Sequence, residues 1–90
     1  MTAAARFQAT VMAGHKENAV EVPFSPAERW GLVAESIAPR RRGVPVRAEV
    51  DGQALDSHVV ARSGRFWLLL PAAVSREAGV CVSVMLEPAS

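Results

Sequence analysis

The chain has little of several features that would define its chemistry: it has one cysteine, no tyrosine and no long apolar run among its 90 residues. A single cysteine, Cys81, excludes an internal disulfide and is typical of a reducing compartment. No apolar stretch approaches the roughly 20 residues that span a membrane as a helix. The polar residues Arg6, Gln8 and Thr10 interrupt the first apolar residues, so no signal peptide is expected. These absences predict a cytoplasmic protein that does not enter a membrane.

The chain also has little net charge, because ten basic and nine acidic residues leave +1 at neutral pH. A balance so close to neutral favours no strongly charged partner. Half of the residues are apolar, which indicates a folded globular chain rather than a disordered one. At this length we expect one domain spanning residues 1–90.

The clearest local pattern is an alternation of apolar residues that ends in an Asp51-Gly52 pair. The apolar positions are Val44, Val46, Ala48 and Val50. Both residues of a tight two-residue hairpin turn need a positive φ, which an Asp-Gly pair readily adopts. The pattern therefore predicts two antiparallel strands, over 44–50 and 53–61. Pro45 has no amide donor, so the first of them is expected to begin at a sheet edge or a bulge.

Four further segments read as strands. Apolar and polar residues alternate over 7–13 and 20–24, which a polar turn joins into a second hairpin. Residues 66–70 are apolar on both faces, as in a strand buried on two sides. A valine stripe predicts the last strand over 80–86. Six strands indicate a mainly β protein, and we expect a small barrel.

Two short helices are expected between these strands. Ser25 can accept a hydrogen bond from a free amide of a first turn, and Pro26 needs no donor there, so a helix is predicted from Pro26 to a stop at Pro39. Its inner face would hold Trp30, Val33, Ala34 and Ile37. A second helix, of two turns, is predicted over 71–79, with Gly79 as its end. The arginines at 40–42 are expected in an exposed loop.

Residue types that perform catalysis or bind metals occur without the spacing that those roles need. Asp56, Ser57 and His58 are the types of a hydrolase triad, but neighbours on a strand point to opposite faces, so Ser57 would face away from the other two. The soft metal ligands, His15, His58 and Cys81, lack the close pairs of a zinc site. We expect no catalytic residue, no metal and no cofactor.

A structural role also accounts for each remaining candidate for a functional residue. Glu49 and Asp51 share a strand face beside Arg47, which is typical of an outer barrel surface rather than a general acid and base. Trp67 lies in an apolar run and is expected in the core, whereas Trp30 is expected to pack across the barrel mouth. Cys81 has no cationic neighbour in sequence and is expected to be inert.

Taken in order, these motifs resemble a prokaryotic family known only as a domain of unknown function, often fused to a bacteriocin-protection (YdeI/OmpD-associated) domain. The motifs are Phe7-Gln8-Ala9, Val22-Pro23, Gly43 through Pro45-Val46-Arg47 to Gly52, Gly64, and Arg76-Glu77-Ala78-Gly79. The resemblance implies that the small barrel with two short helices is a double-split β-barrel, an architecture also used by AbrB-like and MazE-like DNA-binding proteins. A shared fold does not by itself transfer function.

These observations favour a non-catalytic binding or interaction module whose partner is a protein or a small molecule, and which is a monomer or a homodimer. The first alternative is a nucleic-acid-binding protein of AbrB-like architecture. It would use arginines of the central third of the chain, namely Arg40, Arg41, Arg42, Arg47, Arg62 and Arg65. The near-neutral charge and the acids between these arginines weigh against it. The second alternative is an enzyme or small-ligand site at the barrel mouth.

Overall fold

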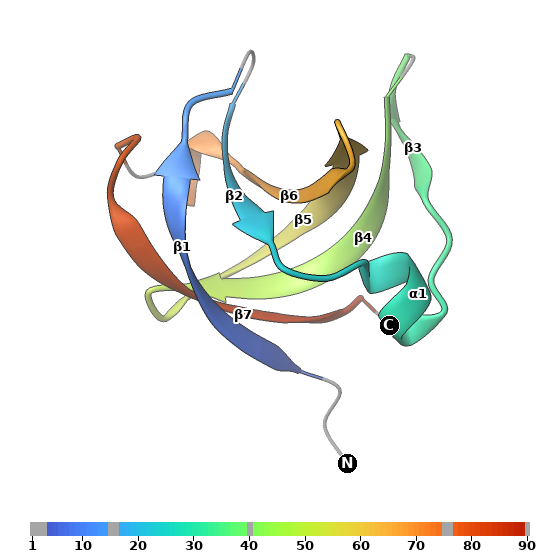
Figure 1. The fold of residues 1–90 in the computed structure, drawn as a ribbon, viewed down its shortest axis with the longest axis horizontal. Coiled ribbons are helices and arrows are strands. Elements are labelled where there is room, and N and C mark those ends of the chain that lie inside the picture. Colours follow the sequence, from blue (N-terminus) through green and yellow to red (C-terminus); the bar gives the residue numbers. More distant parts are fainter. Residues whose placement is uncertain (1–3, 15–16, 40, 75–76, 90) are drawn as a thin grey trace.

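Antiparallel strands make up most of the computed structural model, which describes residues 4–14, 17–39, 41–74 and 77–89 (Figure 1). Within these residues there are seven strands, one α-helix and one 3-10 helix. In chain order they are β1 (Ala5–Met12), β2 (Asn18–Val22), α1 (Pro26–Trp30), β3 (Glu35–Ala38), β4 (Arg41–Val50), β5 (Gln53–Arg62), β6 (Arg65–Leu70), η1 (Ala72–Val74) and β7 (Cys81–Pro88). The mainly β prediction is confirmed.

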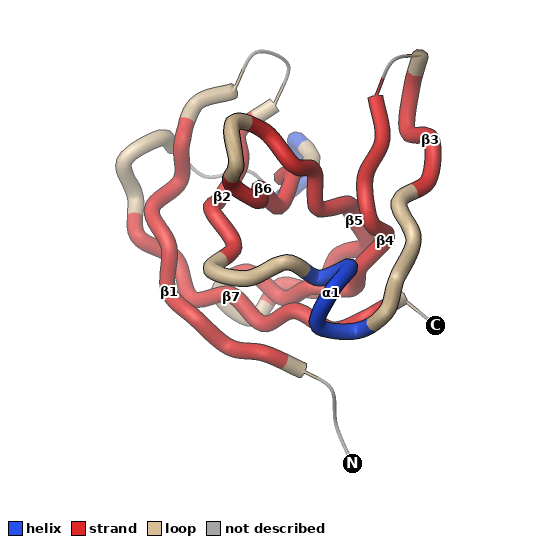
Figure 2. Tube along the Cα trace, turned by 45° about the vertical axis from the view of Figure 1, so that its right-hand side comes forward, coloured by secondary structure: helices blue, strands red, loops and turns tan. Residues whose placement is uncertain are grey.

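The sheet closes on itself. Its strands follow the order β3-β4-β5-β6-β2-β1-β7, and β7 also pairs with β4, so six strands form a closed barrel (Figure 2). The short β3 lies outside the ring, on the edge of β4. Pairing of β4 with β3 ends at Gly43, and pairing with β7 begins at Val46. Pro45 lies in the gap between these two partners, where its missing amide donor costs no ladder hydrogen bond.

The predicted β4–β5 hairpin is confirmed. Val50 pairs with Gln53, and the two turn residues have positive φ, 50° at Asp51 and 85° at Gly52. Asp51 also ties the turn to β7. Its carboxylate accepts from the Ser83 amide at 2.8 Å, and its own amide donates to the Ser83 carbonyl at 2.9 Å. The turn thus fixes the register of two neighbouring ladders.

The barrel interior is an apolar core. Among the described residues, no buried one is polar or charged. The residues that face inward are Val11, Val20, Val22, Val44, Val46, Ala48, Val50, Val59, Leu68, Leu70, Val82, Val84 and Leu86. Partly buried side chains of α1 and its flanks pack against this cluster, and Phe24 makes edge-on contacts with Phe7 and Trp30. The expected packing of Trp30 at one end of the barrel is confirmed.

The first helix is much shorter than predicted. Ser25 caps it as expected, since its hydroxyl accepts from the Glu28 amide, but α1 ends at Trp30 because Gly31 adopts a left-handed conformation with φ 65°. The residues predicted to share one face then separate. Val33 is 80% exposed, and Ile37 lies in β3. The prediction of a helix up to Pro39 was therefore wrong.

Two further predictions need correction. Arg41 and Arg42 lie in β4, paired with β3, rather than in an exposed loop, and Arg40 lies outside the described residues. Of the two-turn helix predicted over 71–79, residues 75 and 76 lie outside the described residues; the described part contains a single 3-10 turn at 72–74, and Ala78 is exposed rather than inward. Residues 79 and 80 bond instead to β1, because the Gly79 amide donates to the Val11 carbonyl at 2.7 Å.

Candidate functional site

A cleft of about 370 Å³ lies on the outer face of β2, β5 and β6. Its floor is made by Ala19, Val60, Leu69 and Trp67. Val59 and Leu68 point into the barrel, and successive side chains of a strand alternate, so Val60 and Leu69 point outward. This patch is a second apolar cluster, separated from the barrel interior by the sheet itself.

Two hairpins form the walls of the cleft. Figure 1 shows the β1–β2 hairpin and the β3–β4 hairpin on opposite sides of the β5–β6 turn. Met12 lines the cleft from the first hairpin and Pro39 from the second, and Ile37 packs against the floor.

Gly43 allows the second wall to lie close to the barrel. A methyl group on residue 43 would lie 2.7 Å from Cδ1 of Ile37 and 2.9 Å from Cβ of His58. Atoms in van der Waals contact do not approach so closely, so a larger residue would push β3 away from β5. The glycine that begins the Gly43-to-Gly52 motif is thus required by the packing beside the cleft.

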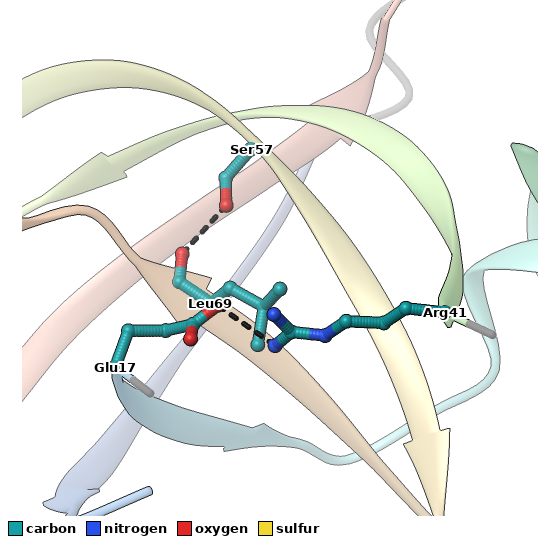
Figure 3. Close-up of polar contacts among 4 residues, drawn as sticks. All are labelled: Glu17, Arg41, Ser57 and Leu69. Carbon is teal, nitrogen blue, oxygen red and sulfur yellow. Dashed lines mark hydrogen bonds and ion pairs between the residues drawn. The ribbon is translucent and has the colours of Figure 1, made fainter. Parts of the chain in front are cut away.

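An ion pair between Glu17 and Arg41 connects the two walls. Nη2 of Arg41 lies 2.7 Å from Oε1 of Glu17, and each side chain is only 23% exposed. Figure 3 shows the two side chains meeting beside Leu69. A pair this short and this sheltered from water is stronger than an exposed one, because solvent screens it less.

The cleft floor is also supported from inside the barrel. The β5–β6 ladder runs from Arg62 and Arg65 to Val59 and Leu68. Just beyond that register, the Ser57 hydroxyl donates to the Leu69 carbonyl at 2.6 Å (Figure 3). Ser57 therefore extends the connection between β5 and β6 under the floor.

The Asp56-Ser57-His58 sequence has a different partner at each residue. Asp56 faces Arg47 at 3.8 Å, and His58 lies 3.3 Å from the Glu35 carboxylate. Ser57 points to the opposite side, as its position in the strand predicted. The geometry places these three side chains in three separate contacts.

The structure does not gather the predicted arginines into one surface. Arg41 binds Glu17, Arg42 donates to the Ala34 carbonyl at 2.9 Å, and Arg65 lies 3.5 Å from Glu21. Arg47 faces Asp56 in a separate, shallow hollow whose lining also includes Glu49 and Glu87. Acidic side chains thus accompany Arg47, as the sequence suggested.

Arg62 differs from the other arginines of this set. It lines the cleft, and within the described residues it has no ion pair. The cleft therefore carries one paired guanidinium, one unpaired guanidinium and one carboxylate among its described lining residues.

The other sequence candidates lie outside the cleft. The Asp51 carboxylate is engaged with the β7 backbone, and Cys81 is exposed at the start of that strand. The described residues contain no group of three or more His, Cys, Asp or Glu side chains that could hold a metal ion. His15 lies outside the described residues.

The prediction of Trp67 in the core holds only in part, because Trp67 packs against the smaller apolar cluster of the cleft floor and not in the barrel interior. Trp67 lies opposite Val60 on β5 and Glu21 on β2, which puts it on the outer face, where it is half-buried at the cleft. Sequence reasoning also missed Glu17 as a partner of Arg41. One signal was present, since Leu69 and Val60 are apolar at outward positions of their strands and therefore indicate that something covers that face.

The fold and the cleft define a small antiparallel β-barrel domain. Over residues 7–86 the sequence matches the family described as a domain of unknown function (DUF1905), and the chain belongs to that family. A search of curated proteins found no match. None of the helices in the described part of the chain is long and apolar enough to cross a membrane. The fusion to a bacteriocin-protection domain, the double-split arrangement and the AbrB likeness stay predictions.

Proposed function

We propose that this domain is a non-catalytic binding module and that the cleft between the β1–β2 and β3–β4 hairpins is its binding surface. The observation that carries the proposal is an apolar floor on the outside of a barrel whose interior is already filled. Ligand sites are typically concave and mostly apolar, with a few placed polar groups, and have volumes of roughly 300 to 1,000 Å³. The cleft fits that description in volume and lining.

Two features of the cleft favour recognition over a purely structural role. Met12 is 50% exposed at the rim, and a flexible thioether there can adapt to what it contacts. The Glu17–Arg41 pair places charged groups beside the apolar floor, as in a site that combines apolar contact with a few polar groups.

The proposal assigns no catalytic group. Ser57 supports it, since its hydroxyl is committed to a main-chain carbonyl, and Asp56 and His58 are each beside another partner. The proposal places the domain in the cytoplasm, where its lone cysteine is not required to form a disulfide.

A fragment screen by two-dimensional amide NMR tests the proposal. We expect fragments that bind to shift the signals of residues 19, 60, 67 and 69 together. Met12→Glu should abolish these shifts, because it puts a carboxylate beside the apolar floor. The matched control is Val33→Glu, which changes an apolar residue that is 80% exposed and does not line the cleft. Fragments that bind elsewhere, or bind equally to the Met12→Glu variant, would contradict the proposal.

A further inference from the structure

We infer that the cleft takes a small organic acid, a carboxylate attached to a ring or another compact apolar group. This inference rests on the proposed function and names the chemical class of its ligand. Three independent features of the cleft carry it: Arg62, which has no ion pair in the part of the chain that the structure describes, the carboxylate already bound at the rim, and the apolar floor.

Arg62 supplies a free positive charge at the cleft. An arginine side chain stays protonated in proteins and offers five donors in a planar fork that matches a carboxylate. The arginine across the turn, Arg65, already faces Glu21, whereas Arg62 has no ion pair within the described residues. Two guanidinium groups and one carboxylate among the described lining residues leave an excess of one positive charge, which complements a monoanion.

Glu17 shows that the rim can hold a carboxylate. Its carboxylate sits 2.7 Å from Arg41 in a place where both side chains are 23% exposed. Reduced contact with water strengthens such a charge-assisted hydrogen bond. We expect a ligand carboxylate bound to Arg62 to compete with Glu17 for Arg41, because both arginines are among the residues that line the cleft.

The floor supplies the apolar half of the site. The indole of Trp67 is half-buried there, next to Leu69 and Val60. A flat ring can stack on an indole and displace water from it, while its carboxylate stays at the charged rim. A neutral apolar molecule would leave Arg62 without a partner. A small anion without a ring would leave the apolar floor in contact with water.

The test titrates three probes into the full chain and follows the amide signals of the cleft. Benzoate carries ring and charge, benzyl alcohol carries the ring alone, and acetate carries the charge alone. We expect benzoate to shift the signals of residues 60, 62, 67 and 69, with an affinity about tenfold above that of either other probe, since each lacks one of the two contacts. A tripeptide ending in phenylalanine serves as the other source of a carboxylate, and tighter binding of that peptide than of benzoate would overturn the assignment to a free acid.

Substitutions then separate the contacts. Arg62→Gln should weaken benzoate about tenfold and leave benzyl alcohol unchanged. Its matched control is Arg65→Gln, in the same hairpin, which should change neither by more than about twofold. Glu17→Gln should strengthen benzoate by roughly threefold, because it removes the competing carboxylate from Arg41. Thermal unfolding of each variant verifies that the barrel is intact.

The outcomes distinguish the ligand class from the proposed function. If benzyl alcohol binds the cleft as well as benzoate does, and Arg62→Gln has no effect, the cleft is a binding site but the organic-acid class is wrong. If Glu17→Gln weakens benzoate, competition at Arg41 is wrong and the inference fails. If none of the probes shifts the cleft signals, the class is rejected, while the fragment screen decides the proposed function separately.

Discussion

The inside of the barrel and the outer face of β2, β5 and β6 are both apolar, yet they differ in how they are covered. The interior is closed by six strands, with side chains of α1 packed at one end, and its largest residues are fully buried. The outer patch is covered only in part, by two hairpins that leave a cleft with charged groups at its rim. Closure of the ring accounts for the first region, whereas the second has apolar residues that the barrel itself does not require.

Neighbouring leucines of β6 provide the largest test of that comparison. Leu68 is fully buried in the interior, and Leu69 is 8% exposed on the outer patch. Leu68→Ala should lower the free energy of unfolding by about 4 kcal/mol, because it leaves a cavity in a closed core. Leu69→Ala should cost only about 2 kcal/mol, since it opens into an existing cleft. Chemical denaturation measures both, and equal losses would contradict the distinction.

The next prediction tests whether Gly43 sets the close approach of β3 to β5. Gly43→Ala should destabilise the fold by about 2 kcal/mol, because the added methyl group collides with Ile37 and His58. Ile37→Val removes Cδ1, the nearest atom. In the double variant the combined loss should be smaller than the sum of the two single losses. Additive losses would mean that this contact does not set the spacing of the wall.

Two of the ion pairs on the outer face allow a smaller and sharper comparison. A double-mutant cycle on Glu17 and Arg41 should give a coupling energy of about 1 kcal/mol, at the upper end for such pairs, since both side chains are largely shielded. The same cycle on Glu21 and Arg65, which are 45% and 64% exposed, should give about 0.3 kcal/mol. High salt should reduce the second coupling more than the first. Equal coupling energies would mean that shielding from water does not make the Glu17–Arg41 pair stronger than the Glu21–Arg65 pair.

Substitution of Arg47 should have the smallest effect on the free energy of unfolding. Arg47 faces Asp56 at 3.8 Å with both side chains well exposed, so Arg47→Gln should change the free energy of unfolding by less than about 0.5 kcal/mol.

Acids surround Arg47, and the other described arginines of the predicted nucleic-acid set have partners or lie at the cleft. We expect no retention of duplex DNA even at about 50 mM salt, measured by mobility shift. Tight binding with a steep salt dependence would favour the nucleic-acid alternative instead.

Local patterns in the sequence predicted the elements whose cause is local. The Asp51-Gly52 turn, the valine alternation and the Ser25 cap each depend on a few neighbouring residues, and each is confirmed. The long first helix was wrong because Gly31 takes a left-handed conformation that ends α1, while the spacing of the apolar residues still suited a helix.

The cleft depends on contacts that a sequence pattern does not contain. Glu17 and Arg41 are 24 positions apart, and they meet only because the β1–β2 and β3–β4 hairpins stand beside the same strands. Trp67 lies in a strand that is apolar on both faces, so alternation could not assign its side. The register of β6 against β2 and β5 decides it.

Fluorescence quenching of Trp67 tests most directly whether the outer patch is an open cleft with a positive rim. In a Trp30→Phe variant Trp67 is the only tryptophan, and it can be exposed to the anion iodide and the cation caesium in turn. We predict that iodide quenches Trp67 more strongly than caesium does, and that Arg62→Gln removes most of the difference, because a guanidinium with no ion pair among the described residues attracts the anion. A Trp67 that neither ion reaches, or that both quench equally, would contradict an open, cation-rimmed cleft.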